Sequence, residues 1–169
     1  MSLPKRKLTR LKGYDYSDPG AYFITICVKN RKEILSEITE TNIYEQPQNT
    51  LTPYGKVAHK HLINMSNFYD DIKIEKFVIM PNHIHMLIQI YECNNPKETS
   101  QPTIPANSSI AKFISTFKRF CNKEYGENIW QARSHDHIIR GEADYIKIYE
   151  YIDTNVINWE SDCFYKKEE

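Results

Sequence analysis

The segment Phe77–Ile90 restricts the fold more than any other part of the chain, because it sets two histidines one residue apart in an otherwise apolar run. Side chains alternate across a β-strand, so a strand here carries His83 and His85 on one face, together with Leu87 and Gln89. The opposite face is a continuous apolar row of Ile84, Met86, Ile88 and Ile90. The segment therefore predicts a strand with one face in a hydrophobic core and two imidazoles on the other.

Alternate Cα atoms of a strand lie about 7 Å apart, which lets two imidazoles converge on one cation. Two imidazoles alone do not complete a metal site, and buried histidines also form hydrogen bonds with backbone carbonyl groups or water. The pair therefore predicts either part of a metal site or two structural histidines. Other segments of the chain have to distinguish these alternatives.

The length and composition predict a single folded domain over residues 1–169, since 40% hydrophobic and 26% charged residues suffice for a core and a solvated surface. The formal net charge of zero argues against a uniformly basic nucleic-acid-binding protein. Positive charge nevertheless gathers in a basic arm, residues 1–13, which contains Lys5, Arg6, Lys7, Arg10 and Lys12. Such an arm is either a contact for phosphate groups or a solvated terminus.

The four cysteines are widely scattered and form no Cys-x-x-Cys motif, so they indicate neither a disulfide framework nor a structural zinc site. The polar start of the sequence has no apolar signal core, and no run of about 18 apolar residues follows. The sequence therefore predicts a protein of the reducing cytoplasm with no membrane partner.

Hydrophobic periodicity and turn residues divide the rest of the chain into strands and helices. The predicted elements are a strand over 21–28, a helix capped by Thr52 and Pro53 that runs to about Phe68, a strand over 72–80, the histidine strand, a helix capped by Ser108 or Ser109, a strand over 130–140 and a helix over 142–159. A weak pattern over 34–44 predicts an irregular strand or hairpin closed by residues 46–49. Residues 92–107 are rich in turn formers and predict a flexible loop.

The order strand, helix, strand, strand, helix, strand is that of a ferredoxin-like split βαβ domain. The fold class expected is therefore α+β, with an antiparallel sheet and one additional C-terminal helix. The histidine strand is expected to pair antiparallel with strand 72–80 through the turn at Pro81 and Asn82.

A second His-x-His pair, His135 and His137, competes with the first. Its flanks are more polar, and Asp136 between the two histidines could accept a hydrogen bond from a metal ligand as readily as bind a metal itself. Both pairs therefore stay candidates at this stage.

The last predicted helix separates its three tyrosines. Residues at three- and four-residue intervals predict a buried stripe of Tyr145, Ile148, Tyr149, Ile152, Val156 and Trp159.

Tyr151 lies about 200° round the helix from Tyr149, on a face shared with Lys147 and Asn155. Tyr151 and Asn155 are one turn apart, so both reach the same spot. That spacing suits a tyrosine that attacks a phosphorus atom beside an amide that helps to hold a metal, and equally suits two ordinary exposed side chains. Phenol is a weak nucleophile at neutral pH, so Lys147 or the metal would have to stabilise the phenolate.

These motifs together resemble a known family. Met80-Pro81-Asn82-His83-Ile84-His85 resembles the HUH motif of single-tyrosine transposases. Asp136-His137-Ile138-Ile139-Arg140 followed by Tyr151-Ile152-Asp153-Thr154-Asn155 is similar to the REP-associated tyrosine transposases, and the resemblance runs from near Lys12 to near Tyr165. It implies a ferredoxin-like sheet that carries the two histidines and a late helix that carries the nucleophile.

The resemblance implies cleavage and rejoining of single-stranded or hairpin DNA. Tyr151 would attack the scissile phosphate, leaving a 5′-phosphotyrosine and a free 3′-hydroxyl, and His83, His85 and Asn155 would bind Mg²⁺ or Mn²⁺. Imidazole ligands alone would indicate zinc or manganese. The predicted DNA-binding residues are Arg6, Lys7, Arg10, Lys118 and Arg119, and the auxiliary candidates are Lys147, Asp136 and His137.

Two departures from the family accompany the resemblance. The insertion-sequence branch usually has glutamine where Asn155 stands, and the Asn-Pro step common after the tyrosine is missing. Two other functions stay open. One is a ferredoxin-like nucleic-acid-binding module with structural histidines, and the other is a metal-dependent phosphoesterase that uses water, with His135 and His137 taking part. The sequence also leaves open whether the protein acts as a monomer or as a homodimer.

Overall fold

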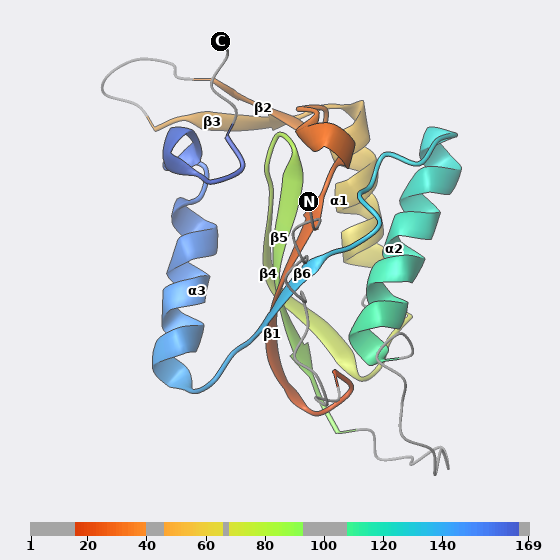
Figure 1. Ribbon diagram of the computed structural model, residues 1–169, viewed down its shortest axis with the longest axis vertical. Helices are drawn as coiled ribbons and strands as arrows, with labels where there is room; N and C mark the ends of the chain where they lie inside the picture. The colour runs from red at the N-terminus through yellow and green to blue at the C-terminus, as the bar shows by residue number, and fades with distance from the viewer. Residues whose placement is uncertain (1–15, 40–45, 66–67, 93–107, 166–169) are drawn as a thin grey trace, which may run out of the picture.

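The structure is a computed structural model, and it describes residues 16–39, 46–65, 68–92 and 108–165. Its main feature is a four-stranded antiparallel sheet that lies between two layers of helices (Figure 1). The strands are β1 (Gly20–Cys27), β4 (Ile72–Ile79), β5 (His83–Ile90) and β6 (His135–Ile138), in the spatial order β4-β5-β1-β6. This order and the antiparallel pairing of β4 with β5 confirm the predicted ferredoxin-like α+β fold.

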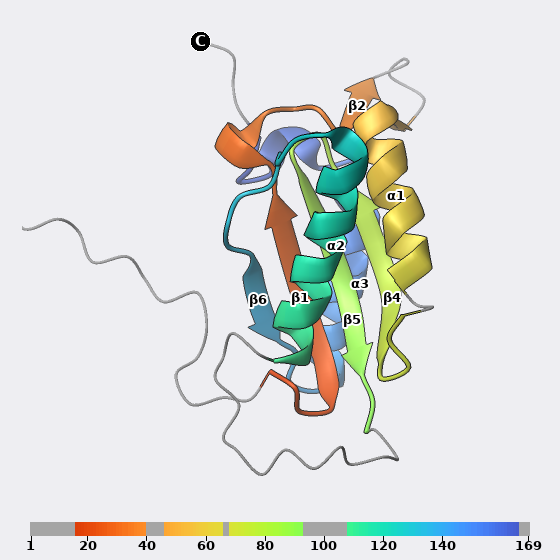
Figure 2. The same cartoon turned by 90° about the vertical axis from the view of Figure 1, so that its right-hand side faces the viewer.

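Helices α1 (Pro53–Met65) and α2 (Ser109–Tyr125) cover one face of the sheet, and α3 (Glu142–Thr154) covers the other (Figure 2). The main core lies on the side of α1 and α2, where the predicted apolar row of β5 is fully buried. On the opposite face, Leu87 packs against Ile148 and Ile152 of α3. Strand β5 is therefore buried on both faces, and its histidines do not lie on an open surface.

Hydrogen bonds at the helix ends explain where α1 and α2 begin. Thr52 Oγ1 accepts from the backbone N–H of Gly55 at 3.2 Å, and Ser108 Oγ accepts from that of Ala111 at 3.3 Å. Both N-caps confirm the sequence prediction. Helix α2 ends at Gly126, whose φ of 75° is the left-handed conformation that favours glycine.

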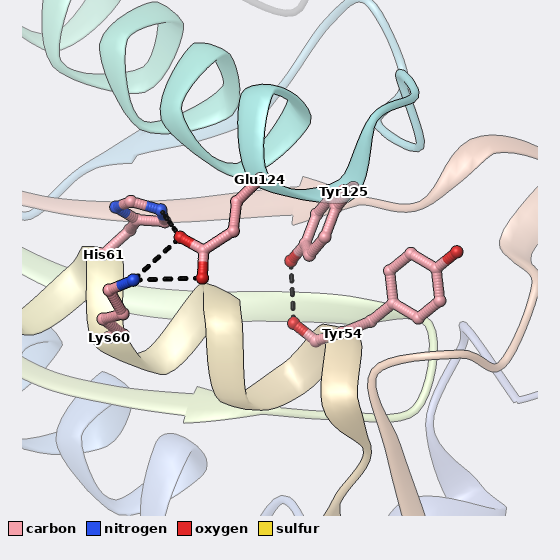
Figure 3. A network of polar contacts seen from close by, with 5 residues as sticks. All are labelled: Tyr54, Lys60, His61, Glu124 and Tyr125. Carbon is pink, nitrogen blue, oxygen red and sulfur yellow. Dashed lines mark hydrogen bonds and ion pairs between the residues drawn. The ribbon is translucent and has the colours of Figure 1, made fainter.

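Polar side chains join α1 to α2 (Figure 3). The Glu124 carboxylate accepts from Lys60 Nζ at 2.9 Å and lies 2.9 Å from His61 Nε2. The Tyr125 hydroxyl donates to the Tyr54 carbonyl at 2.7 Å. These contacts hold the two helices as one layer behind the sheet.

A separate two-stranded sheet consists of β2 (Ser36–Thr39) and β3 (Gln48–Leu51). Strand β2 falls within the segment predicted as an irregular strand or hairpin. The expected closing turn over 46–49 was wrong in part, because Gln48 and Asn49 pair with Thr39 and Ile38 as strand residues. Helix α1 ends at Met65 rather than near Phe68.

Several predictions concern residues outside the described ranges. These are the basic arm with Arg6, Lys7 and Arg10, and the loop predicted over 92–107 beyond residue 92. Of the cysteines, Cys27, Cys121 and Cys163 are free thiols. Among the described residues, no helix has the length and apolar character that crossing a membrane would require.

The C-terminal third departs from the prediction in its element boundaries. Strand β6 covers only 135–138 of the expected strand over 130–140, with one isolated bridge between Trp130 and Val28. Helix α3 ends at Thr154, and a 3-10 turn (Trp159–Ser161) follows after a run of turns. Residues 154–158 are threonine, asparagine and β-branched types that favour a helix weakly, which explains the early end.

The predicted buried stripe of α3 is narrower than expected. Ile148, Ile152 and Trp159 are buried, but Tyr149 is 40% exposed, so its assignment to the core was wrong. Its ring lies 3.6 Å below the Lys76 ammonium at the β4 edge of the sheet. A single helix on a sheet buries only the residues that point directly at it, and this leaves the flanking tyrosine at the rim.

Candidate active site

His83 and His85 lie on the face of β5 that α3 covers, and they are 0% and 1% exposed. Their rings meet at a centroid distance of 4.3 Å. Burial lowers the pKa of both imidazoles below the usual range, because a charged ring loses its hydration there. Both histidines are therefore neutral at physiological pH, the form in which imidazole binds metals.

Each histidine is held through its Nδ1 atom. His83 Nδ1 lies 2.9 Å from Asn82 Oδ1, and His85 Nδ1 lies 2.8 Å from Thr25 Oγ1 on the neighbouring strand. The Asn82 amide group donates to the Phe164 carbonyl at 2.9 Å, which leaves its oxygen to accept from His83. Because the Asn82 oxygen can only accept, the His83 proton is on Nδ1 and its lone pair is on Nε2, whereas the Thr25 hydroxyl engages His85 Nδ1 and leaves Nε2 facing the cluster. His83 Nε2 is buried and has no hydrogen-bond partner within the described part of the chain.

Helix α3 brings Tyr151 to these imidazoles. The Tyr151 hydroxyl lies 3.4 Å from His85 Nε2 and donates to Asp162 Oδ2 at 3.0 Å. The packing of Ile148 and Ile152 on Leu87 fixes the helix, so the phenol points into the cluster while the residue stays 39% exposed. Tyr151 is therefore aimed at the histidines and accessible from solvent.

Asn155, one helical turn after Tyr151, is 1% exposed and lies at the C-cap of α3. Its Nδ2 donates to Asp162 Oδ2 at 3.1 Å, whereas its Oδ1 is buried with no hydrogen-bond partner in the described residues. An unpaired buried acceptor costs on the order of 1–3 kcal/mol. Asn155 Oδ1 and His83 Nε2 are two buried atoms of this kind, and both residues lie next to Asp162, where a cation could be held.

Asp162 is a member of the cluster that no sequence motif singled out. It follows the 3-10 turn after α3, and its second oxygen accepts from the backbone N–H of Phe164 at 2.7 Å. Its carboxylate and ring nitrogens of His83 and His85 lie within 4.8 Å of one another, close enough to bind one metal ion. Helical spacing in the sequence could not have identified it, because α3 ends at Thr154 and Asp162 lies beyond that end.

Burial and the Asp162 carboxylate together raise the pKa of Tyr151, because a phenolate would be partly desolvated and would face a second negative charge. The phenol is therefore protonated in this arrangement and donates to the carboxylate. Only a compensating positive charge between these groups would make the phenolate accessible.

The C-terminal segment closes the cluster on the side away from β5. The Phe164 ring lies 4.5 Å from the His83 ring and 5.9 Å from the His85 ring, and Trp159 lies 6.0 Å from His83. These aromatic side chains exclude water from the two imidazoles. The cluster is therefore enclosed, with Tyr151 at its accessible edge.

The structure does not bring the auxiliary candidates into this cluster. Asp136 is paired with Ile24, a residue of the main core, and so lies on the opposite face of the sheet. His137 faces the α3 side, but its Nε2 lies 2.9 Å from Asp144 Oδ2 at the start of that helix. Lys147 is exposed, and its charge acts on the same Asp144 carboxylate.

The second His-x-His pair differs from the first in burial, because His135 and His137 are both exposed. Among the described residues, the group of three side chains arranged to hold a metal is His83, His85 and Asp162. The geometry therefore favours the first pair as the metal centre.

The two predicted DNA-binding residues of α2 point to different neighbours. Lys118 Nζ donates to the Gln131 carbonyl at 2.8 Å, close to the end of β1. The Arg119 guanidinium is exposed and lies 5.4 Å from the centre of the Phe120 ring. They do not form one surface.

Comparisons with known proteins agree with this fold. No established family profile matches the sequence. An uncharacterized protein from Haemophilus influenzae is 36% identical over 173 residues, covering 95% of this chain and 93% of the relative. The structure of a REP-associated tyrosine transposase bound to a REP hairpin superimposes with a TM-score of 0.61 at 20% identity, over 94% of this chain and 74% of that one. A candidate transposase from Deinococcus radiodurans has a TM-score of 0.45 at 15% identity, over 86% of this chain and 97% of that one. At 20% identity, the likeness to the REP-associated transposase shows a shared fold.

Proposed function

The chain belongs to one family with the Haemophilus influenzae protein and has the fold of a REP-associated tyrosine transposase, and on these grounds we propose that it is a metal-dependent nuclease of the tyrosine transposase type. It cleaves and rejoins single-stranded DNA through a covalent bond to Tyr151. The observation that carries this proposal is the approach of the Tyr151 hydroxyl to 3.4 Å from His85 Nε2 beside the half-buried Asp162 carboxylate.

The residues present fit a divalent cation. The donors are His83 Nε2, His85 Nε2, Asn155 Oδ1 and the Asp162 carboxylate, two nitrogen and two oxygen types that suit Mn²⁺ better than Mg²⁺. The orphaned lone pairs of His83 and Asn155 support this assignment. A cation bound there polarises the phosphoryl oxygen and offsets the negative charge of Asp162.

In the cleavage step the Tyr151 oxygen attacks the phosphorus of a phosphodiester. A tyrosine-to-phosphorus bond forms and the bond from phosphorus to the 3′-oxygen breaks, so the products are a 5′-phosphotyrosine and a 3′-hydroxyl. Asp162 already accepts the hydrogen bond of the phenol and is placed to receive its proton, and the leaving 3′-oxygen takes up a proton in turn. Attack by a 3′-hydroxyl on the phosphotyrosine reverses the step and rejoins a strand without another energy source.

Two further features support this proposal. Tyr151 and the histidines meet within one chain, so cleavage by a chain's own tyrosine needs no second copy. The structurally similar REP-associated transposase was solved with a REP hairpin, and hairpin or single-stranded DNA is therefore the proposed partner here. Arg6, Lys7, Arg10 and Arg119 stay proposed phosphate contacts.

Trapping of the covalent intermediate tests the proposal. Labelled hairpin DNA with a single-stranded flank, incubated with the protein and Mn²⁺, should give an adduct that survives denaturing electrophoresis. Tyr151→Phe should reduce the adduct to background, since it removes only the attacking oxygen. Tyr149→Phe is the matched control, because Tyr149 is equally exposed on the same helix and points to Lys76 instead.

The same experiment decides between the other two functions. Strand cleavage that persists in Tyr151→Phe would favour a phosphoesterase that uses water. DNA binding without cleavage in any divalent metal would favour a binding module, although α3 covers the sheet face that RNA-recognition-type modules leave open for stacked bases.

A further inference from the structure

The turn that follows β1 holds an arginine in an unfavourable backbone conformation. In the 3-10 turn Lys29–Arg31, Asn30 has a φ of 57° and Arg31 a φ of 53°. Asparagine tolerates the left-handed region, but for an arginine this conformation costs about 1 kcal/mol or more. Glycine or asparagine would adopt it with less strain, so the reason for an arginine at this position lies in its side chain.

This turn is attached directly to the active site. The backbone N–H of Val28 donates to the carbonyl of Asn82, the residue that holds His83, at 2.9 Å. Arg31 Nη1 donates to the Cys163 carbonyl at 2.8 Å, and the guanidinium lies 4.8 Å from the centre of the Phe164 ring. Cys163 and Phe164 immediately follow Asp162. The guanidinium therefore lies at the rim of the cluster formed by His83, His85 and Asp162.

Three cationic side chains near this turn donate hydrogen bonds to backbone carbonyl groups. Lys29 donates to the Asn128 carbonyl at 2.7 Å, Arg31 to Cys163 at 2.8 Å and Lys118 to Gln131 at 2.8 Å. All these acceptors are neutral carbonyl oxygens, and none of the three cations forms an ion pair with a carboxylate within the residues that the structure describes. Three lysines elsewhere, Lys60, Lys73 and Lys76, each pair instead with an acidic side chain.

The three cations lie close together at the carboxyl end of β1. Arg31 and Lys118 both act electrostatically on the Cys27 thiol, and the backbone N–H of Gln131 donates to the Cys27 carbonyl at 2.9 Å. Asp162 of the candidate metal centre acts on the same thiol, so the carboxylate near these cations belongs to the metal centre and none of the three forms an ion pair with it among the described residues. A cluster of positive charges of this kind attracts a polyanion.

We propose that Arg31, with Lys29 and Lys118, binds phosphodiester groups of the DNA strand that occupies the active site. The proposal rests on the proposed function and extends it, because it places the path of the strand from Tyr151 across the end of β1. A guanidinium has five N–H donors. One of them donates to the Cys163 carbonyl, so others can donate to two phosphate oxygens. Burial lowers the pKa of Lys118 to about 8, and a neighbouring phosphate would favour its charged form.

Salt dependence of DNA binding tests the proposal. Binding of a fluorescent single-stranded oligonucleotide would be measured by anisotropy at several salt concentrations, with EDTA and in the Tyr151→Phe background so that no cleavage occurs. Arg31→Asn keeps a residue that accepts the left-handed backbone and removes the charge. It should weaken binding and reduce the slope of log K against log salt by about 0.7, the value for one phosphate contact to a single strand.

Controls separate this contact from a general loss of charge. Lys56→Gln removes an exposed positive charge from α1, a helix that carries none of the three cations, and should leave the slope unchanged. Arg31→Lys should keep most of the slope. Lys29→Gln gives a second slope that should fall in the same way, so a folding defect in Arg31→Asn alone does not decide the outcome.

The results also separate this inference from the proposed function. An unchanged slope in both Arg31→Asn and Lys29→Gln, in a protein that still forms the Tyr151 adduct, would overturn the phosphate contact and leave the nuclease. A parent protein that binds no DNA would overturn both.

Discussion

Two hydrogen bonds determine which nitrogen each active-site imidazole offers. Asn82 and Thr25 engage the Nδ1 atoms of His83 and His85, so that both Nε2 atoms face the cluster with Asp162. Neither partner carries a charge, which matters because a buried carboxylate here would add to the negative charge of Asp162. Partners of this kind typically change metal affinity by one to two powers of ten when they are lost.

Thr25→Val tests this role, because valine keeps the branched shape and removes the hydroxyl. His85 then loses the hydrogen bond that orients its ring, and we expect the affinity for Mn²⁺ to fall by about tenfold or more. Thr25→Ser restores the hydroxyl and should restore the affinity. Calorimetric titration of the DNA-free protein with Mn²⁺ measures both, and equal affinities for the valine and serine variants would argue against the role.

For single residues, the sequence predicts the neighbours that strand alternation and helical spacing determine. The alternation of β5 places His83 with His85, and helical spacing places Tyr151 with Asn155, and these four residues do meet. Thr25 could not be predicted, since its contact depends on the register between β1 and β5. Asp162 lies beyond the end of α3, where no periodic pattern gives the direction of the chain.

At the scale of elements, close packing of α1 on the chain before β2 positions the histidine strand. A Cβ atom at Gly55 would lie 1.9 Å from the Leu35 carbonyl oxygen, so only glycine allows this approach. The backbone N–H of Leu35 donates to the Pro81 carbonyl at 2.9 Å, and Pro81 is two residues before His83. A displacement of α1 is therefore passed to the turn that leads into β5 and to His83, the first of the proposed metal ligands.

Two glycine substitutions separate stability from this positional effect. Gly55→Ala should lower the free energy of unfolding by about 1–3 kcal/mol and also weaken Mn²⁺ binding, because the Leu35 backbone has to move. Gly126→Ala should cost about 1 kcal/mol through its left-handed backbone alone, since nothing lies within 4 Å of the added methyl group. Denaturant unfolding and Mn²⁺ titration of both variants check this. Normal Mn²⁺ binding in a destabilised Gly55→Ala protein would show that the contact is only structural.

Element boundaries were less predictable than element types. The capping residues Thr52 and Ser108 gave correct helix starts because a cap is a local hydrogen bond. The end of α3 and the short β6 depend on what covers them, and Tyr149 was misplaced for the same reason. An apolar stripe on a helix shows which side chains point the same way. How many of them are buried depends on the surface against which the helix packs.

At the scale of the molecule, helices on both faces of the sheet enclose two histidines that water would otherwise solvate. Burial lowers the pKa of both rings in the folded protein, whereas in the unfolded chain they titrate near 6.5. Below that pH the unfolded chain binds more protons than the folded one, so acid favours unfolding.

The metal-free protein should therefore lose stability as the pH falls from about 7 to 5. The expected slope approaches 1.4 kcal/mol per pH unit for each histidine that stays neutral in the folded state. Denaturant unfolding in EDTA across this range measures it. His85→Gln should flatten the dependence, because glutamine does not titrate, and an equally steep loss in that variant would contradict the assignment.

The order of the chain also determines when the proposed chemistry could begin. Strands β1, β4 and β5, with both imidazoles, are synthesised well before Tyr151, Asn155 and Asp162, and β6 then completes the sheet shortly before Tyr151. A nascent protein can therefore fold most of its scaffold while it lacks the nucleophile and both oxygen donors. The proposed strand cleavage could begin only when translation has passed residue 162, and a chain that stops before Tyr151 would lack the proposed nucleophile and both oxygen donors.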